Sequence, residues 1–190
     1  MGYRLITGPA ADPIKLAEAK LHLRVDHSDD DVKIASLIKA ATAHVDGRSG
    51  ILGRCLVTQT WELTLDEFPD GEIEIPLGPV ASITSIKYRD ASNVEQTLSS
   101  ALYTFDDTRT SAYVVPVDDW PATYDVTNAV TVRFIAGTAV ASIPEAIRHA
   151  MLLLIGHWYE ERNAVNVGNI SSVLPFTVEA LLAPYRRVFT

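Results

Sequence analysis

The chain has 190 residues, of which 47% are hydrophobic and 21% are charged, and its formal net charge is −8. This length suits one substantial domain, or one domain with a large insertion, and the composition is ordinary for a globular protein. The negative charge argues against a protein that wraps nucleic acid by neutralising phosphates. The single cysteine, Cys55, excludes an intrachain disulfide and a thiolate zinc site.

Neither a membrane span nor a signal peptide is expected. The longest apolar run in the most hydrophobic region covers only residues 151–155, whereas a span needs roughly 18 apolar residues. The first residues lack a basic segment followed by a long apolar one. We therefore expect a protein that stays inside the cell that makes it.

The first predicted elements are two helices between residues 12 and 50. Asp12 followed by Pro13 is typical of a helix start, and the glycines of residues 47–53 are typical of a helix end. Ser28 or Asp29 can cap the second helix. The apolar face of the first helix is expected to hold Ile14, Ala17 and Leu21, and that of the second Val32, Ala35, Ile38, Ala41 or Thr42, and Val45.

From about residue 55 to residue 136 the hydrophobic pattern changes to a period of two, which indicates strands, the first of them beginning at Cys55. Further strands are expected at residues 72–76, 80–89, 94–98, 101–105, 112–117 and 128–136. Such spacing favours an antiparallel sandwich or small barrel. In the first strand one side holds Cys55, Val57, Trp61, Leu63 and Leu65, and the outward side holds Thr58, Thr60, Glu62, Thr64 and Asp66.

The helical period returns at residue 143, after Ser142, which makes a good N-terminus with Pro144 and Glu145. A loop is expected at residues 163–172, and a last helix at residues 176–188, interrupted by Pro184. The apolar stripe of the first of these helices holds Ile147, Met151, Leu154, Ile155 and Trp158, and the last helix turns Val178, Leu181, Leu182 and Tyr185 inward.

The sequence therefore predicts an α+β fold. A small bundle of two N-terminal and two C-terminal helices, in residues 1–54 and 139–190, carries an inserted antiparallel β-module in residues 55–138.

No motif of catalysis or of metal or cofactor binding emerges. The GxSxG, GxxxxGK[ST] and HExxH motifs are all absent. The acidic stretch at residues 26–31 lacks the ligand spacing of a calcium loop, and carboxylates in the first turn of a helix are stabilised by its dipole. His157, Glu160 and Glu161 share a helix face, which we interpret as a solvated or interface-facing edge. No catalytic, cofactor-binding or metal-ligating residue is assigned.

The C-terminus carries the one cluster of basic and aromatic side chains. It is either a helix end whose arginines complement the dipole, or an anchor for a protein partner, because arginine and aromatic residues are enriched at interfaces. The candidate partner-interface residues are Pro184, Tyr185, Arg186, Arg187 and Phe189.

Several stretches, in one order, resemble a known family. They are residues 16–25, 29–31, 37–41 and 59–62, and then residues 130–137, 143–150 and 157–162. Together they are similar to the head–tail connector, or adaptor, proteins encoded by long-tailed phages, prophages and gene-transfer agents. The similarity spans nearly the whole chain.

The resemblance implies a structural protein of the virion neck, made in the host cytoplasm, with no enzymatic activity and no cofactor. Its implied partners are the portal protein, further copies of itself in a ring of about a dozen, and a downstream stopper or tail-completion protein. Double-stranded DNA would pass through the ring without specific binding. The simplest members are only helical, so the β-module would be an elaboration.

Two alternatives remain open. One is a different neck component, a stopper or tail-completion protein. The other is a β-sandwich that binds sugar or peptide without catalysis, which predicts an exposed patch among Trp61, Tyr103, Tyr113 and Trp120. We expect instead that Trp61 lies in the core and that Trp120 is a packed loop anchor.

Overall fold

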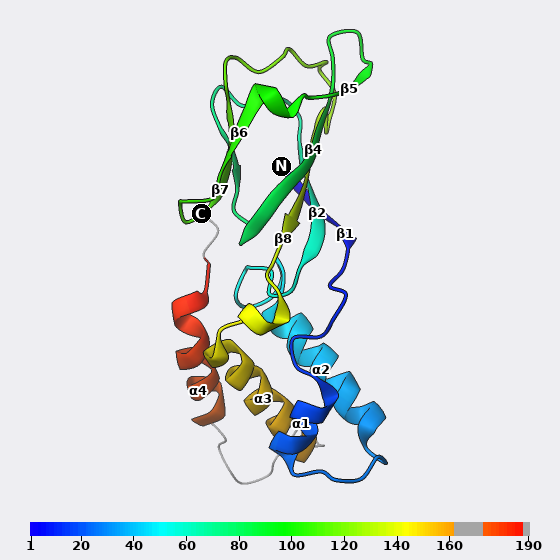
Figure 1. The fold of residues 1–190 in the computed structure, drawn as a ribbon, viewed down its shortest axis with the longest axis vertical. Helices are drawn as coiled ribbons and strands as arrows, with labels where there is room; N and C mark the ends of the chain where they lie inside the picture. Colours follow the sequence, from blue (N-terminus) through cyan, green and yellow to red (C-terminus); the bar gives the residue numbers. More distant parts are fainter. Residues whose placement is uncertain (162–172, 188–190) are drawn as a thin grey trace. The chain divides into compact units, whose positions relative to one another are not determined.

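The computed structural model describes residues 1–161 and 173–187, and it divides the chain into two compact units. The β-unit consists of Met1–Ala10 and Val57–Thr138, and the helical unit consists of Ala11–Leu56 and Ala139–Thr190. Among the described residues, all strands lie in the first unit and all four α-helices lie in the second (Figure 1). The α+β class predicted from the sequence is confirmed.

The β-unit contains two antiparallel sheets and no closed barrel. Both sheets contribute fully buried side chains, among them Leu63, Phe134, Ile75 and Val114. The larger sheet has the order β1 (Gly2–Thr7), β2 (Gln59–Leu65), β8 (Val130–Ala136), β4 (Val80–Arg89) and β5 (Glu95–Thr97), and the smaller has the order β3 (Ile73–Ile75), β7 (Ala112–Pro116) and β6 (Tyr103–Asp106).

The edge strand β1 has no counterpart among the elements expected from the sequence. It pairs antiparallel with β2, so that Tyr3 lies opposite Leu63. Leu5 and Ile6, its aliphatic side chains, remain 47% and 37% exposed. An edge strand whose apolar residues are adjacent and exposed shows no period of two, and this is why the pattern did not reveal it.

Glu62 on β2 was expected on the outward side, and this expectation was wrong, because the residue is only 4% exposed. It lies between Arg4 on β1 and Arg133 on β8, which are its register partners. Arg4 Nη2 donates to Oε2 and Arg133 Nη2 donates to Oε1, each at 2.6 Å. Burial opposes ionisation of Glu62, but the hydrogen bonds from the two guanidinium groups outweigh it, and the pKa lies below its ordinary value.

The helical unit is built around α3 (Glu145–Glu160), whose predicted stripe is confirmed. Ile147, Met151, Leu154 and Ile155 are buried, and Trp158 is half-buried. The other helices are α1 (Leu16–Leu23), α2 (Asp31–Val45) and α4 (Val173–Leu182), followed by a 3-10 turn, Ala183–Tyr185. No described helix combines the length and hydropathy that crossing a membrane would require.

The predicted faces of the first two helices were partly wrong. Leu21 and Val32 are 81% and 85% exposed, whereas Ala19 on α1 and Ile34 on α2 are fully buried. The expected cap at Asp12 is also displaced, because α1 begins at Leu16. The buried residues of α2 are Ile34, Ile38, Ala41 and Val45.

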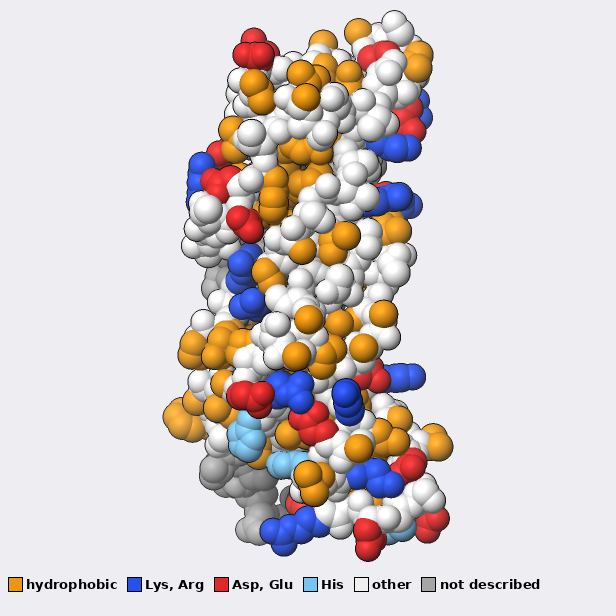
Figure 2. Space-filling view, in the orientation of Figure 1, with side chains coloured by type: hydrophobic (Ala, Val, Ile, Leu, Met, Phe, Trp, Pro, Cys, Tyr) orange, Lys and Arg blue, Asp and Glu red, His pale blue; other side chains and the backbone are white. Residues whose placement is uncertain are grey.

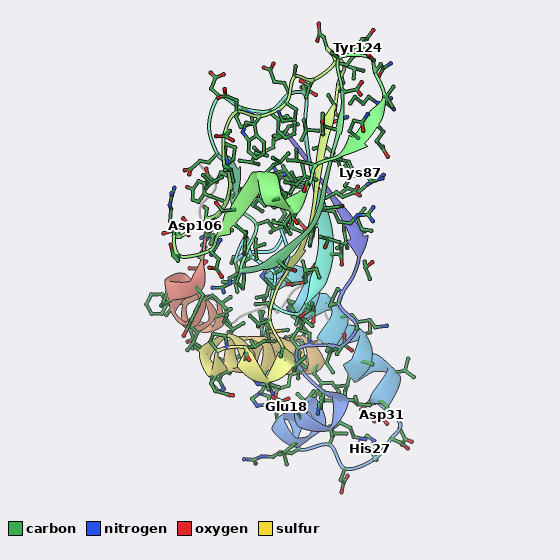
Figure 3. All side chains as sticks on the ribbon, turned by 45° about the horizontal axis from the view of Figure 1, so that its top comes forward. Glu18, His27, Asp31, Lys87, Asp106 and Tyr124 are labelled. Atoms are coloured by element: carbon green, nitrogen blue, oxygen red, sulfur yellow. The ribbon has the colours of Figure 1, made fainter. Side chains whose placement is uncertain are left out.

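Ion pairs explain why α1 presents this face. Arg148 on α3 donates to both carboxylate oxygens of Glu18 at 2.7 Å, and to the carbonyl of Pro13 at 3.0 Å. Lys20 pairs with Asp31 at the start of α2 at 2.6 Å. Figure 3 labels both carboxylates of these pairs, Glu18 on α1 and Asp31 on α2. Because α1 is short, these polar contacts decide its rotation more than its few apolar residues do.

Replacing Glu62 with Gln is expected to lower the free energy of unfolding by about 2 kcal/mol at neutral pH, because two arginines lose their buried counter-charge. Folding lowers the pKa of Glu62 from its ordinary value of 4.5. The ionised carboxylate therefore stabilises the folded state fully above pH 4.5, and this stabilisation is lost as the pH falls through the lower folded-state pKa. Urea unfolding from neutral pH downward should therefore show a weaker acid dependence in the variant.

The matched control is Glu95→Gln, which breaks the exposed pair of Glu95 with Lys87 and should change stability little. Equal effects of the two substitutions would contradict the importance assigned to burial at Glu62.

Candidate functional site

Residues 183–187, the described part of the C-terminal segment, are attached to the helical unit. Val178 and Leu182 on α4 are buried, as predicted, and the Arg187 N–H donates to the carbonyl of Leu52 at 2.8 Å. Of the predicted interface residues, Pro184 and Arg186 are exposed, and Tyr185 and Arg187 are half-buried; Phe189 lies outside the described residues, as does the loop expected at residues 163–172.

The surface that receives this segment is the glycine-rich loop of residues 47–54. Gly47 and Gly53 have positive φ angles of 76° and 59°, and the Gly47 N–H donates to the carbonyl of Arg54 at 2.8 Å. Gly50 packs against the end of α2 so closely that a Cβ would lie 2.3 Å from the carbonyl oxygen of Asp46. Leu52 is fully buried, so its side chain anchors the loop in the core of the helical unit.

The loop and the C-terminal segment together form an open pocket of about 460 Å³, which we call the arginine pocket. Of the arginines in these two segments, the sequence pattern predicts only Arg186 and Arg187 as interface residues, and it predicts the glycines of the loop only as the end of a helix. The signal that could have indicated the loop is the presence of arginines next to glycines, at Arg48 and Arg54. The lining residues are Arg48, Ser49, Gly50, Ile51, Gly53, Arg186 and Arg187.

A fourth guanidinium, that of Arg54, lies close to this group. Burial lowers the pKa of Arg187, and repulsion from Arg54 lowers it further. Burial also lowers the pKa of Arg54, while interaction with Cys55 and Tyr185 opposes that shift. The Nε of Arg54 is buried and has no hydrogen-bond partner among the described residues. The guanidinium groups of Arg54 and Arg187 thus lie near each other in a partly desolvated environment.

The net charge of the chain is unevenly divided. The β-unit carries 13 acidic and 5 basic side chains, a net charge of 5 minus 13, or −8, and the helical unit carries 11 of each, or zero. Figure 2 shows basic side chains next to acidic ones over the helical unit. The arginine pocket is therefore a local concentration of positive charge on a unit that is neutral as a whole.

A second pocket, of about 360 Å³, shares Ile51 with the arginine pocket. It lies among α2, α3 and α4, and the ring of His44 meets that of Trp158 edge to face at 6.1 Å. Its other lining residues are Leu154, His157, Val178 and Glu179, so that the lining is mainly apolar.

The acidic stretch and the histidines form no cation site that the described residues reveal. Within residues 1–161 and 173–187, no three His, Cys, Asp or Glu side chains gather closely enough to hold a metal ion. Asp30 accepts a hydrogen bond from the Tyr159 hydroxyl, and Asp31 pairs with Lys20. His27 lies in the loop between α1 and α2 (Figure 3).

The aromatic side chains that a ligand-binding sandwich would use are all half-buried. Trp120 stacks on Phe68 with ring centroids 4.7 Å apart, and its Nε1 donates to the carbonyl of Gly71 at 2.6 Å. The guanidinium of Arg109 covers the ring of Tyr113 at 4.5 Å. Trp120 is thus the packed loop anchor that was expected, whereas Trp61 is only half-buried rather than part of the core.

One comparison with known proteins shows the family of the chain, and another shows its fold. The family model described as head completion protein matches residues 14–188. No curated protein matches the chain. A chain from the neck of an empty gene transfer agent particle computed with C6 symmetry is similar, with a TM-score of 0.79, 24% identity, and coverage of 100% of this chain and 97% of that one.

Two further solved structures are similar over the same shares of both chains. A chain of the virion of a native gene transfer agent particle has a TM-score of 0.79 and 23% identity. A chain of the neck of a native particle computed with C12 symmetry has a TM-score of 0.77 and 22% identity. At these identities the structural likeness establishes the fold.

Replacing Gly50 with Ala is expected to lower the free energy of unfolding by about 1–3 kcal/mol, because the new methyl group meets backbone that cannot move aside cheaply. Chemical denaturation measures this. Gly71→Ala is the control, since a Cβ at Gly71 meets nothing within 4 Å. If Gly50→Ala unfolds like the wild type, the loop does not pack against α2 as described.

Proposed function

Since the chain belongs to the head completion protein family, we propose that it is a structural adaptor subunit of a virion neck. In this proposal copies of the chain form a closed ring under the portal, extend the DNA channel, and provide the platform for the next neck protein or the tail. The observation that carries the proposal is the family match over residues 14–188, which covers most of both units.

A ring of about a dozen copies is consistent with the C12 symmetry named for the neck that contains one similar chain. A closed ring needs two different faces on each subunit, because its contacts are heterologous. The helical unit has exposed apolar side chains that such contacts can cover, namely Leu21, Val32 and Phe176, on three of its four helices.

The charge of the chain supports a conduit for DNA rather than a binder of DNA. A net charge of −8 on each of about a dozen copies gives a ring near −100, and salt confines its effect to about 10 Å from the surface. Such a surface repels phosphates, so that a duplex can slide without being held. The proposal therefore includes DNA as a passing partner without specific contacts.

The proposed role of the chain is structural and not enzymatic. The family is described by its part in completing the head, which is an assembly role. The most distinctive polar cluster, the arginine pocket, contains no nucleophile paired with a base, which covalent catalysis would need.

A stopper or tail-completion role is the alternative that the family match leaves open, and binding experiments distinguish the two. An adaptor binds the portal directly, whereas the alternative binds other neck or tail components. Purified chain presented separately to portal and to tail tube therefore tests the assignment, and retention on tail tube alone would refute the adaptor role.

Deleting residues 184–190 is expected to leave a folded protein that binds portal at least about tenfold more weakly and no longer joins capsids. The deletion keeps α4 and its buried Leu182, and among the described residues it removes the backbone hydrogen bonds of Arg186 to Ala183 and of Arg187 to Leu52, each worth about 1 kcal/mol. Circular dichroism checks the fold, and pull-down with portal and a capsid-joining assay measure the function.

The control for this deletion is Lys15→Ala with Lys39→Ala, which removes two exposed positive charges elsewhere on the helical unit. This double variant should bind and assemble as the wild type does. Normal assembly of the truncated protein would refute the role assigned to the C-terminal segment.

A further inference from the structure

The larger sheet of the β-unit has an outer face that gathers cations. Val132 and Phe134 on β8 are fully buried, so Arg133, which lies between them, points away from the core. Arg4 on β1 lies in the same row, because both arginines are register partners of Glu62. Since the two guanidinium groups share one carboxylate, this trio has one excess positive charge.

Two more cations extend this face onto β4. Ile86 is fully buried, so Lys87 and Arg89 point outward. Glu95 on β5 pairs with Lys87 at 2.8 Å. The five strands of this sheet contain four basic and two acidic side chains, so their net charge is 4 minus 2, or +2. We call this surface the basic face, and its cations are Arg4, Lys87, Arg89 and Arg133.

The smaller sheet has an outer face of the opposite sign. Ile73 and Ile75 on β3 are buried, so Glu74 between them points outward and is exposed. The register continues this row from Glu74 through Tyr113 on β7 to Asp106 on β6. The three strands of this sheet contain two acidic and no basic side chains, a net charge of −2. We call the surface that carries Glu74 and Asp106 the acidic face.

A nearby arginine does not cancel the charge of the acidic face. Arg109, which follows β6, pairs with Glu72 at 2.6 Å and with Asp106 at 3.1 Å, and its guanidinium covers the ring of Tyr113. Since Glu72 and Arg109 offset each other, the net charge stays at −2. Among the described residues Glu74 forms no ion pair, so its exposed carboxylate can meet a cation of another molecule.

Exposed apolar side chains lie beside both faces. Leu5 and Ile6 follow Arg4 on the edge strand β1. Leu102 and Val117 lie next to each other beside β6 and β7, where the Val117 N–H donates to the carbonyl of Leu102 at 3.0 Å. Protein interfaces combine apolar contacts with charged groups, whereas a DNA duplex is bound by cations on its phosphates. These side chains therefore favour a protein partner over DNA.

The two faces lie on opposite sides of the β-unit. Each sheet buries one face in the common core, so its other face points away from that core. Figure 1 shows β6 and β7 on one side of this unit and β1, β2 and β8 on the other. A closed ring needs such an arrangement, because one face of each copy meets a different face of the next.

We propose that the basic face of each copy docks on the acidic face of the next copy in the ring, so that its cations meet Glu74 and Asp106. This inference rests on the proposed function, because the ring is part of it. A second copy is a partner whose matching surface this structure shows, since a net charge of +2 meets one of −2. The other acidic side chains of the β-unit lie in its loops, where they repel a copy that approaches in another orientation.

The test reverses the charge of each face in the full chain. Lys87→Glu with Arg89→Glu makes the basic face acidic. Glu74→Lys with Thr104→Lys makes the acidic face basic. All four residues are exposed and lie in strands, and circular dichroism checks the fold of each variant.

Either reversal should weaken the association of copies at least about tenfold, because like charges then meet at every contact of the ring. Sedimentation equilibrium at physiological ionic strength measures self-association, and native mass spectrometry counts the copies that bind one portal ring. The control is Lys15→Glu with Lys39→Glu, which changes the net charge as much as the first variant but on exposed residues of the helical unit. The control should associate as the wild type does.

An equal mixture of the two reversal variants should recover the association. In the mixture the reversed basic face of one variant meets the reversed acidic face of the other, and their unchanged faces also meet. The two variants can therefore alternate around a ring. Mixing does not recover a misfolded variant, so this result distinguishes lost charge complementarity from lost structure.

Three results would overturn the inference. The first is association of either reversal variant that equals that of the wild type, in solution and on portal. The second is a mixture that associates no better than its components, although both variants have an unchanged circular dichroism spectrum. The third is a wild type that associates neither in solution nor on portal. Binding of a short DNA duplex that Lys87→Glu with Arg89→Glu abolishes would then assign the basic face to phosphates.

Portal binding separates this inference from the proposed function. If both reversal variants fill the portal ring as the wild type does, the adaptor role stands and the docking of the two faces is refuted. If the mixture recovers association but no form of the chain binds portal, the docking stands and the adaptor role fails.

Discussion

The ion-paired carboxylate of Glu62 is the constraint on which the β-unit depends most. It joins β1, β2 and β8, and these strands come from the start of the chain and from both ends of the segment between the helices. The chain passes between its two units three times, after residues 10, 56 and 138. A buried carboxylate with two guanidinium partners fixes the register of strands at each of these passages, because a shift by one residue would leave a charge unpaired in the sheet.

The net charge is divided unevenly between the two units. The β-unit holds the whole net charge of −8, and the helical unit is neutral but concentrates arginines in one pocket. Because salt confines the field of these charges to about 10 Å, the negative charge acts only on groups close to the β-unit.

The helical unit has exposed apolar side chains that the proposed ring could cover. Its core is formed mainly by α3, with Ile34, Ile38 and Val45 of α2 and Val178 of α4. Large apolar side chains remain exposed on α1, α2 and α4. In the proposed assembly, neighbouring chains can cover these side chains.

The sequence by itself determined the elements and their class. A period of two between residues 59 and 136 and a helical period from Glu145 onward are local consequences of burying one face, so strands, helices and the stripe of α3 could be predicted. Only the tertiary structure decided the buried face of α1, the edge strand β1, the burial of Glu62, and the placement of Arg48 and Arg186 around one pocket. These features depend on strand pairing, ion pairs and packing between residues that are distant in sequence and come together only on folding, and no local spacing records such a contact.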